Sequence, residues 1–168
     1  MGDYRGAAMD RRSKLTLAKV VIALLLVLVL ASLSAKRQAP KLLLHAASRG
    51  SIPMMRVLVR LGVDPASNAA GAYPLYAAVS HGQHAAAKLL LEAGSPVDSL
   101  EPDGATPLMR AAALGDTRAV ELLLAHGAST QARMGCGNAL DIARANRQDS
   151  VARLLEQVIG ARPTAPSR

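Results

Sequence analysis

Aromatic residues and cysteine are scarce in this chain of 168 residues, which has no Phe, no Trp, three Tyr and one Cys. A single cysteine cannot form an internal disulfide, so packed apolar surface must stabilise the fold. Catalytic groups are also missing, because no nucleophile–base pair is recognisable and the glycines recur at intervals instead of clustering in a phosphate-binding loop. We therefore predict a protein that is not an enzyme and has no cofactor and no small-molecule substrate.

Metal ligands are few as well. His81 and His84 form a His-Gly-Gln-His tetrapeptide, but it falls at a turn between two predicted helices instead of on one helix face. A zinc site needs three or four ligands, so we predict no metal site. Cys136 lies between two glycines and is expected to be an exposed free thiol, with an intermolecular disulfide as the alternative.

One long apolar run is present in residues 15–35 (LTLAKVVIALLLVLVLASLSA), with Lys19 as its only charge, after a basic tail at residues 1–14. A helix that spans a bilayer needs about 20 mainly apolar residues, so we predict a single transmembrane helix in contact with membrane lipid. A cleavable signal sequence is the alternative, because small residues stand at Ser32 and Ser34. The length of the run favours the uncleaved signal-anchor.

Lys and Arg flank this segment on both sides, five in residues 1–19 and four in residues 20–50. Positively charged flanks remain in the cytoplasm, so the slight excess predicts a cytoplasmic N-terminus with the rest of the chain outside the cytoplasm. The Ala-, Leu- and Arg-rich composition favours a bacterial source, and the protein would then sit in the inner membrane facing the periplasm. The alternative is a periplasmic or secreted protein.

The net charge of +8 comes mostly from the N-terminal part of the chain. Residues 1–37 contribute +5 (seven basic, two acidic), residues 38–160 contribute +1 (eleven basic, ten acidic), and residues 161–168 contribute +2. Nucleic-acid-binding proteins gather positive charge on one face and stack bases on aromatic side chains. We therefore predict no nucleic-acid partner and assign the basic flanks to anionic lipid headgroups.

A short helix is predicted for residues 107–114 in the stretch GATPLMRAAALG. Thr106 can cap its first turn, the proline is tolerated at the first helical position, and Gly115 can adopt the left-handed conformation that ends a helix. A helix of about two turns is unstable alone. Neighbouring helices must therefore support it, and its alanines leave room for them to come close.

The same pattern recurs about every 32 or 33 residues. Residues 106–115 align with residues 43–50, 73–82 and 138–144. Each copy is followed by a second apolar run at helical spacing, in residues 55–65, 86–96, 119–129 and 151–160. A period near 33 indicates a solenoid in which a short helix, a tight turn, a longer helix and a Gly-bearing connection repeat.

The stretch DGATPLMRAAALGDTRAVELLLAHGAS resembles an ankyrin repeat, whose pattern is G-x-T-P-L-H-x-A-A-x-x-G followed by an apolar run and G-A. The resemblance implies an all-α ankyrin-repeat solenoid of helix-turn-helix units over residues 36–160, preceded by the transmembrane helix and followed by a disordered tail at residues 161–168. Its four repeats would be residues 39–65, 71–98, 104–131 and 137–160. The terminal repeats are expected to have modified surfaces, because one side of each faces water.

Ankyrin repeats bind other proteins through a concave face made by the connections and the inner side of each first helix. The resemblance therefore implies a membrane-anchored scaffold or adaptor for a partner protein. The alternative is an exported protein that chaperones, protects or neutralises an envelope enzyme or toxin. Transferred by position, the exposed inner residues would be Asp103, Arg110, Ala113 and Leu114 in repeat three, Ala77, Ser80 and His81 in repeat two, and His45, Ser48 and Arg49 in repeat one.

Overall fold

The computed structural model describes residues 38–69, 71–135 and 137–161. The predicted transmembrane helix at residues 15–35 and the basic tail before it lie outside these ranges. Of the predicted disordered tail at residues 161–168, only Ala161 is described, and it is helical instead of disordered. Within them the regular structure is helical, apart from two isolated bridges. None of the helices described is long and apolar enough to cross a membrane.

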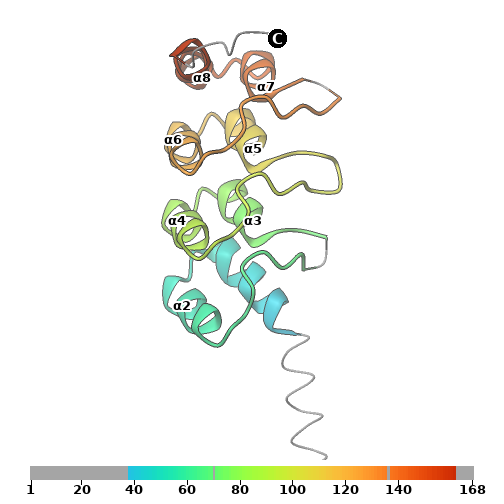
Figure 1. Ribbon diagram of the computed structural model, residues 1–168, viewed down its shortest axis with the longest axis vertical. Coiled ribbons are helices and arrows are strands. Elements are labelled where there is room, and N and C mark those ends of the chain that lie inside the picture. Colours follow the sequence, from blue (N-terminus) through green and yellow to red (C-terminus); the bar gives the residue numbers. More distant parts are fainter. Residues whose placement is uncertain (1–37, 70, 136, 162–168) are drawn as a thin grey trace, which may run out of the picture. The chain divides into compact units, whose positions relative to one another are not determined.

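The helices form pairs that follow one another along the chain. Residues 38–49 are helical and pair with α2 (Ile52–Arg60). The later pairs are α3 (Pro74–Ser80) with α4 (His84–Glu92), α5 (Pro107–Leu114) with α6 (Thr117–Ala125), and α7 (Ala139–Ala145) with α8 (Asp149–Ala161). Figure 1 shows the pairs stacked in chain order, with the connections projecting to one side. The predicted all-α solenoid is confirmed.

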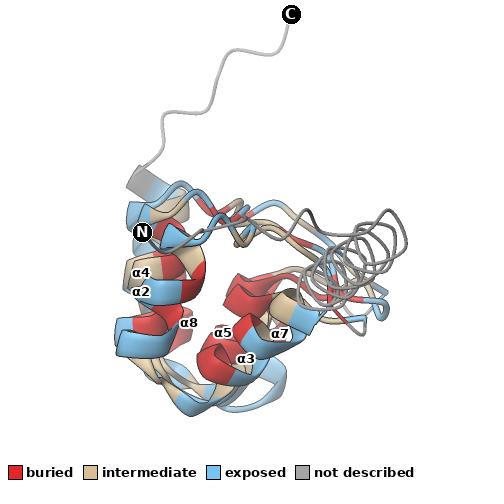
Figure 2. Ribbon diagram, turned by 90° about the horizontal axis from the view of Figure 1, so that it is seen from below, coloured by how far each residue is buried: buried red, intermediate tan, exposed pale blue. Residues whose placement is uncertain are grey.

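Two columns of helices enclose the core. The first helices α3, α5 and α7 contact one another in sequence, and so do the second helices α2, α4, α6 and α8. Buried residues line the space between the columns (Figure 2). One position of the first helix is alanine in every pair and almost fully buried: Ala46, Ala78, Ala111 and Ala143. A methyl group at this position lets adjacent helices approach closely, as the alanine-rich sequence predicted.

Helix α5 begins and ends as its sequence predicts. The Thr106 side-chain oxygen accepts a hydrogen bond from the Met109 backbone N–H at 3.2 Å, and Pro107 is the first helical residue. Gly115 ends the helix in the left-handed conformation, with φ 72°. The bounds follow from local chemistry because both caps satisfy backbone groups that a short helix leaves unpaired.

The two ends of the stack differ. The last pair has polar side chains on its outer side, where Arg144 Nη2 contacts Glu156 Oε1 at 2.7 Å. The first pair exposes large apolar side chains: Leu42, Met54, Val57 and Leu61. The expected modification of a terminal surface is therefore found at the C-terminal end, whereas the first described pair carries apolar residues at the corresponding end.

Candidate functional site

A cavity of about 260 Å³ opens between the first helices and the connections that precede them. It draws on α3, α5 and α7, three successive repeats. Its lining residues are Tyr76, Asp103, Ala105, Met109, Arg110, Ala113, Met134, Ile142, Ala145 and Asn146. Apolar side chains predominate, and a few polar groups converge on them, which is the usual composition of a binding pocket.

Helix α5 forms the middle of this cavity. Leu108 and Ala111 are fully buried and fix the face of α5 that packs on the core. This orientation leaves Arg110 and Ala113, which lie near the opposite face, partly exposed at the cavity. Met109 is 2% exposed and lines the cavity from within the core.

The polar groups of the cavity hold one another in place. Arg110 Nε donates a hydrogen bond to Ser80 Oγ at 3.2 Å, which joins repeats two and three. Burial raises the pKa of the Tyr76 hydroxyl above its ordinary value of 10, although the Arg110 charge and a hydrogen bond with Ser80 oppose the shift. The phenol is therefore neutral at physiological pH and is available as a hydrogen-bond donor.

Asp103 carries the negative charge of the lining. Its Oδ1 accepts a hydrogen bond from the Ala105 backbone N–H at 3.0 Å, so the carboxylate also shapes the connection before α5. Together with Arg110 it gives the cavity charges of both signs around an apolar interior. This arrangement suits an apolar side chain of a peptide or protein that also bears polar groups.

Carboxylates fix the spacing of the connections that support the cavity. Glu101 is 8% exposed, and its Oε1 accepts a hydrogen bond from the Tyr73 backbone N–H at 3.0 Å. Burial raises the pKa of Glu101 above its ordinary value of 4.5; the hydrogen bond from Tyr73 lowers it and Asp103 raises it further. Asp98, in the same connection as Glu101, accepts hydrogen bonds from the Ser129 N–H of the following connection at 3.0 and 3.2 Å.

The predicted inner residues of repeat three fit the cavity best. Asp103, Arg110 and Ala113 line it, whereas Leu114 is 44% exposed and does not. In repeat two, Ser80 contacts Arg110. His81 is exposed, and its Nδ1 lies 2.8 Å from the Ala77 carbonyl oxygen in the same helix.

Two other expectations meet different outcomes. Ala77 was expected to be exposed but is buried, with an exposed fraction of 9%. The reason is that α3 lies between neighbouring first helices, which bury five of its seven residues. In repeat one, His45 and Arg49 are exposed, and Ser48 Oγ donates to the His45 carbonyl oxygen at 2.9 Å. These three residues belong to the helix at residues 38–49 and do not line the cavity.

Several lining residues were not predicted: Tyr76, Ala105, Met109, Met134, Ile142, Ala145 and Asn146. The 32-residue offset contains the signal for three of them, because it carries Arg110, Ala113 and Leu114 onto Ile142, Ala145 and Asn146. Tyr76 and Met134 give no such signal. Their place at the cavity depends on how consecutive repeats stack.

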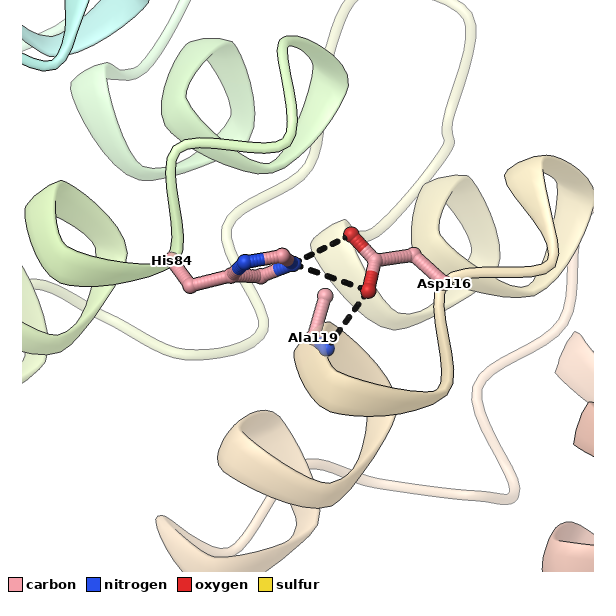
Figure 3. Close-up of polar contacts among 3 residues, drawn as sticks. All are labelled: His84, Asp116 and Ala119. Atoms are coloured by element: carbon pink, nitrogen blue, oxygen red, sulfur yellow. Dashed lines mark hydrogen bonds and ion pairs between the residues drawn. The ribbon is translucent and has the colours of Figure 1, made fainter.

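The two histidines of the His-Gly-Gln-His tetrapeptide are separated by a turn, as predicted. His81 follows α3 and His84 begins α4. His84 Nε2 lies 2.7 and 2.9 Å from the Asp116 carboxylate oxygens of the next repeat (Figure 3). In the part of the chain that the structure describes, no three metal-ligating side chains gather. Cys136 lies outside that part.

Two wider grooves lie on the other side of the stack, between second helices. One of about 580 Å³ separates α2 from α4, and one of about 510 Å³ separates α6 from α8. Arg, Lys and Glu side chains line much of the first, where Lys88 and Glu92 form an exposed pair at 3.9 Å. Exposed ion pairs of this kind contribute little to the stability of the fold. We interpret both grooves as gaps between solvent-exposed helices and not as binding sites.

Comparison with known proteins identifies the repeats. The sequence matches the family described as Ankyrin repeats (3 copies) over residues 18–99 and 93–167. The two matches together extend over most of the chain. No curated protein matches it.

Proposed function

Because the chain belongs to the ankyrin-repeat family, we propose that it is a membrane-anchored scaffold whose partner protein binds in the cavity between α3, α5 and α7. Ankyrin repeats are protein–protein interaction modules and are typically non-catalytic. The observation that carries the proposal is the cavity itself, in which three repeats contribute apolar side chains and a few fixed polar groups. Extended concave surfaces of solenoids serve this role because each repeat adds contacts along one face.

The chemistry of the lining defines the partner further. Met109, Met134 and Ile142 offer an apolar contact, and methionine adapts to irregular shapes. Arg110 and Tyr76 provide donors, and Asp103 provides an acceptor. The partner element is an exposed segment with one large apolar side chain flanked by polar or charged groups, as interface anchors commonly are.

The membrane anchor is the second part of the proposal. It depends on the apolar run at residues 15–35 and its basic flanks. We place the N-terminus in the cytoplasm and the repeats outside it, at the periplasmic side of a bacterial inner membrane. The alternative is an exported soluble protein, released by signal cleavage, that protects or neutralises an envelope enzyme or toxin.

Affinity capture from detergent-solubilised membranes tests the binding face. Arg110→Glu reverses a charge at the cavity, and Arg118→Glu makes the same change at an exposed position of α6 that does not line it. A partner retained by the wild type and by Arg118→Glu, but lost with Arg110→Glu, supports the cavity. Equal retention by all three proteins contradicts it.

Two measurements test the anchor. An uncleaved anchor resists alkaline extraction from membranes and leaves the intact mass unchanged, apart from N-terminal methionine processing. Loss of about 34 residues from the mature chain would establish the exported alternative. For orientation, a reporter active only outside the cytoplasm, fused after residue 168, should be active, and an inactive reporter contradicts the proposed topology.

A further inference from the structure

The N-terminal end of the repeat stack exposes an apolar surface. We define the N-terminal end face by Leu42, Met54, Val57 and Leu61, residues that are 50, 48, 52 and 76% exposed. Met54 and Val57 lie in α2, and Leu61 directly follows it. The three residues are at helical spacing and therefore share one face. Only Leu100 and Leu114 are comparably exposed among the other large apolar residues that the structure describes.

Two of the four positions on this face are buried in every later repeat, and the Val57 position is half-buried there (Leu89, Leu122 and Leu154). Leu42 corresponds to Pro74, Pro107 and Ala139, which are all buried. Met54 corresponds to Ala86, Ala119 and Val151, which are 0–1% exposed. Ala86, Ala119 and Val151 belong to the buried core of the stack. The first repeat thus presents an apolar surface suited to burial, although no further repeat covers it in the part of the chain described.

The opposite end shows how this chain adapts a surface to water. Arg144 stands at the position of Ala112, which is fully buried in repeat three. Glu156 stands at the position of Leu124, and the two charged side chains form an ion pair at 2.7 Å. Solenoids need such polar outer faces at their ends to remain soluble. The absence of the same adaptation at the N-terminal end face indicates that something other than water covers it.

Basic residues accompany this face in the sequence. Residues 38–63 contain Lys41, Arg49, Arg56 and Arg60, and the first acidic residue is Asp64. Lys41 directly precedes Leu42 in the chain, whereas Arg56 and Arg60 line the groove between α2 and α4. The ion pairs found within the described ranges do not include these four cations. A second copy of the chain that met this face symmetrically would bring like charges together, because a two-fold interface uses the same patch twice. The face instead complements a negatively charged surface with an apolar interior.

The chain itself brings such a surface near. Residue 38 is the third residue after the predicted transmembrane segment, which ends at residue 35. Three residues span at most roughly 10 Å, since an extended chain covers about 3.3–3.6 Å per residue. If the segment crosses the membrane, as proposed above, the headgroup region lies within reach of the N-terminal end face.

We propose that the N-terminal end face rests on the membrane surface, with its apolar side chains inserted among the headgroups and its cations bound to anionic lipid. Amphipathic surfaces bind membranes through this combination of apolar burial and attraction to anionic headgroups. The contact fixes the repeats against the bilayer and leaves the cavity between α3, α5 and α7 open. This inference rests on the proposed anchor.

The test uses the full chain in vesicles. A single cysteine is introduced by Val57→Cys in a Cys136→Ser background, labelled with an environment-sensitive fluorophore and quenched by lipid carrying a nitroxide near its headgroup. The control label is at Gln157→Cys, an exposed position in the last repeat. The vesicles contain phosphatidylcholine, with or without phosphatidylglycerol. We expect quenching several times stronger at position 57 than at position 157, and stronger with phosphatidylglycerol.

The cations supply a second measurement. Lys41→Gln with Arg49→Gln should lower the ratio of membrane-contacting to free label in phosphatidylglycerol vesicles by roughly 25-fold, because each basic residue contributes about a fivefold preference near an anionic surface. Circular dichroism of every variant checks that the repeats remain folded.

The remaining outcomes separate the two proposals. A protein that resists alkaline extraction but shows no lipid quenching at position 57 overturns the membrane contact and leaves the anchor intact. A protein released by alkali overturns both. Shielding of the label without lipid contact also overturns the membrane contact. If this shielding depends on protein concentration, a second copy covers the face. If it does not, the chain's own N-terminal segment covers it.

Discussion

Asp116 stabilises this fold in two ways through one carboxylate. Its Oδ1 accepts the Ala119 N–H at 3.0 Å and so caps the start of α6. Both of its oxygens also contact His84 Nε2 of the preceding repeat (Figure 3). His84 is 39% and Asp116 18% exposed, so solvent weakens the contact between them more than it weakens the cap.

Replacing Asp116 by Ala should therefore lower the free energy of unfolding by about 1–2 kcal/mol, the usual effect of removing a helix N-cap. His84→Ala leaves the cap in place and should lower it by less than about 1 kcal/mol. Urea denaturation of both variants measures the difference. If His84→Ala proves as damaging as Asp116→Ala, the contact between repeats, and not the cap, is the main contribution.

Glu101 is a buried carboxylate whose effect on stability depends on pH. Burial is the largest cause of its raised pKa. A carboxyl with a higher pKa in the folded state binds its proton more tightly there. Its contribution is therefore fully present below the unfolded-state pKa of about 4.3 and is lost as pH rises through the higher folded-state pKa.

We expect the stability of the wild type relative to Glu101→Gln to fall as pH rises from about 4.3. Glutamine keeps an oxygen that can accept the Tyr73 N–H and does not titrate. Denaturant unfolding of both proteins from pH 4 to pH 7 gives this difference. A relative stability that rises with pH would mean that the hydrogen bond from Tyr73 outweighs burial, and the direction given for the pKa would be wrong.

At the scale of helices, the end of the first helix shows how one position is used in each repeat. Gly50, Gly82 and Gly115 have φ of 68, 65 and 72°. The fourth repeat has Arg147 at the equivalent position, with φ 58°. A residue with a Cβ carries a penalty of roughly 1–2 kcal/mol in the left-handed region, so the chain stores strain at Arg147 that glycine avoids in the other repeats.

The substitutions Arg147→Gly and Gly115→Ala should act in opposite directions. Arg147→Gly should stabilise by up to about 1 kcal/mol, because relief of the left-handed strain is partly offset by the greater freedom of glycine in the unfolded chain. Gly115→Ala should destabilise by about 1 kcal/mol or more, and its new Cβ would also displace the Gln148 side chain. Thermal unfolding of both variants provides the measurement. A destabilised Arg147→Gly would show that the arginine side chain makes a compensating contact.

Local chemistry explains how far the sequence could predict these elements. The bounds of α5 follow from Thr106, Pro107 and Gly115, whose effects act within one helical turn. The burial of Ala77 and the place of Met134 at the cavity depend on the stacking of separate repeats, and no pattern within one repeat records it. The contrast between the two ends of the stack also depends on stacking. From the sequence alone, apolar residues such as Leu42 would be predicted to lie in the core.

At the scale of the molecule, the main contacts among helices α2 to α8 join elements of the same pair or of adjacent pairs. Stability in such an array is close to a sum of repeat terms and nearest-neighbour interface terms. A repeat inside the array has two interfaces and a terminal repeat has one. The same loss of packing should therefore destabilise more helices when it occurs in an inner repeat than when it occurs in a terminal one.

Leu108 and Leu155 allow this to be tested, because both are fully buried, one in α5 of the third repeat and one in α8 of the last. Each Leu→Ala change should remove about 2–5 kcal/mol of local packing. Native-state hydrogen exchange should then show faster opening of α7 and α8 alone for Leu155→Ala, because only one interface separates them from the rest. For Leu108→Ala the faster exchange should extend from α3 to α8, since both interfaces of the third repeat lose support. Uniform acceleration along the whole array in both variants would instead show that the repeats unfold as one cooperative unit, in which the position of a defect does not limit its reach.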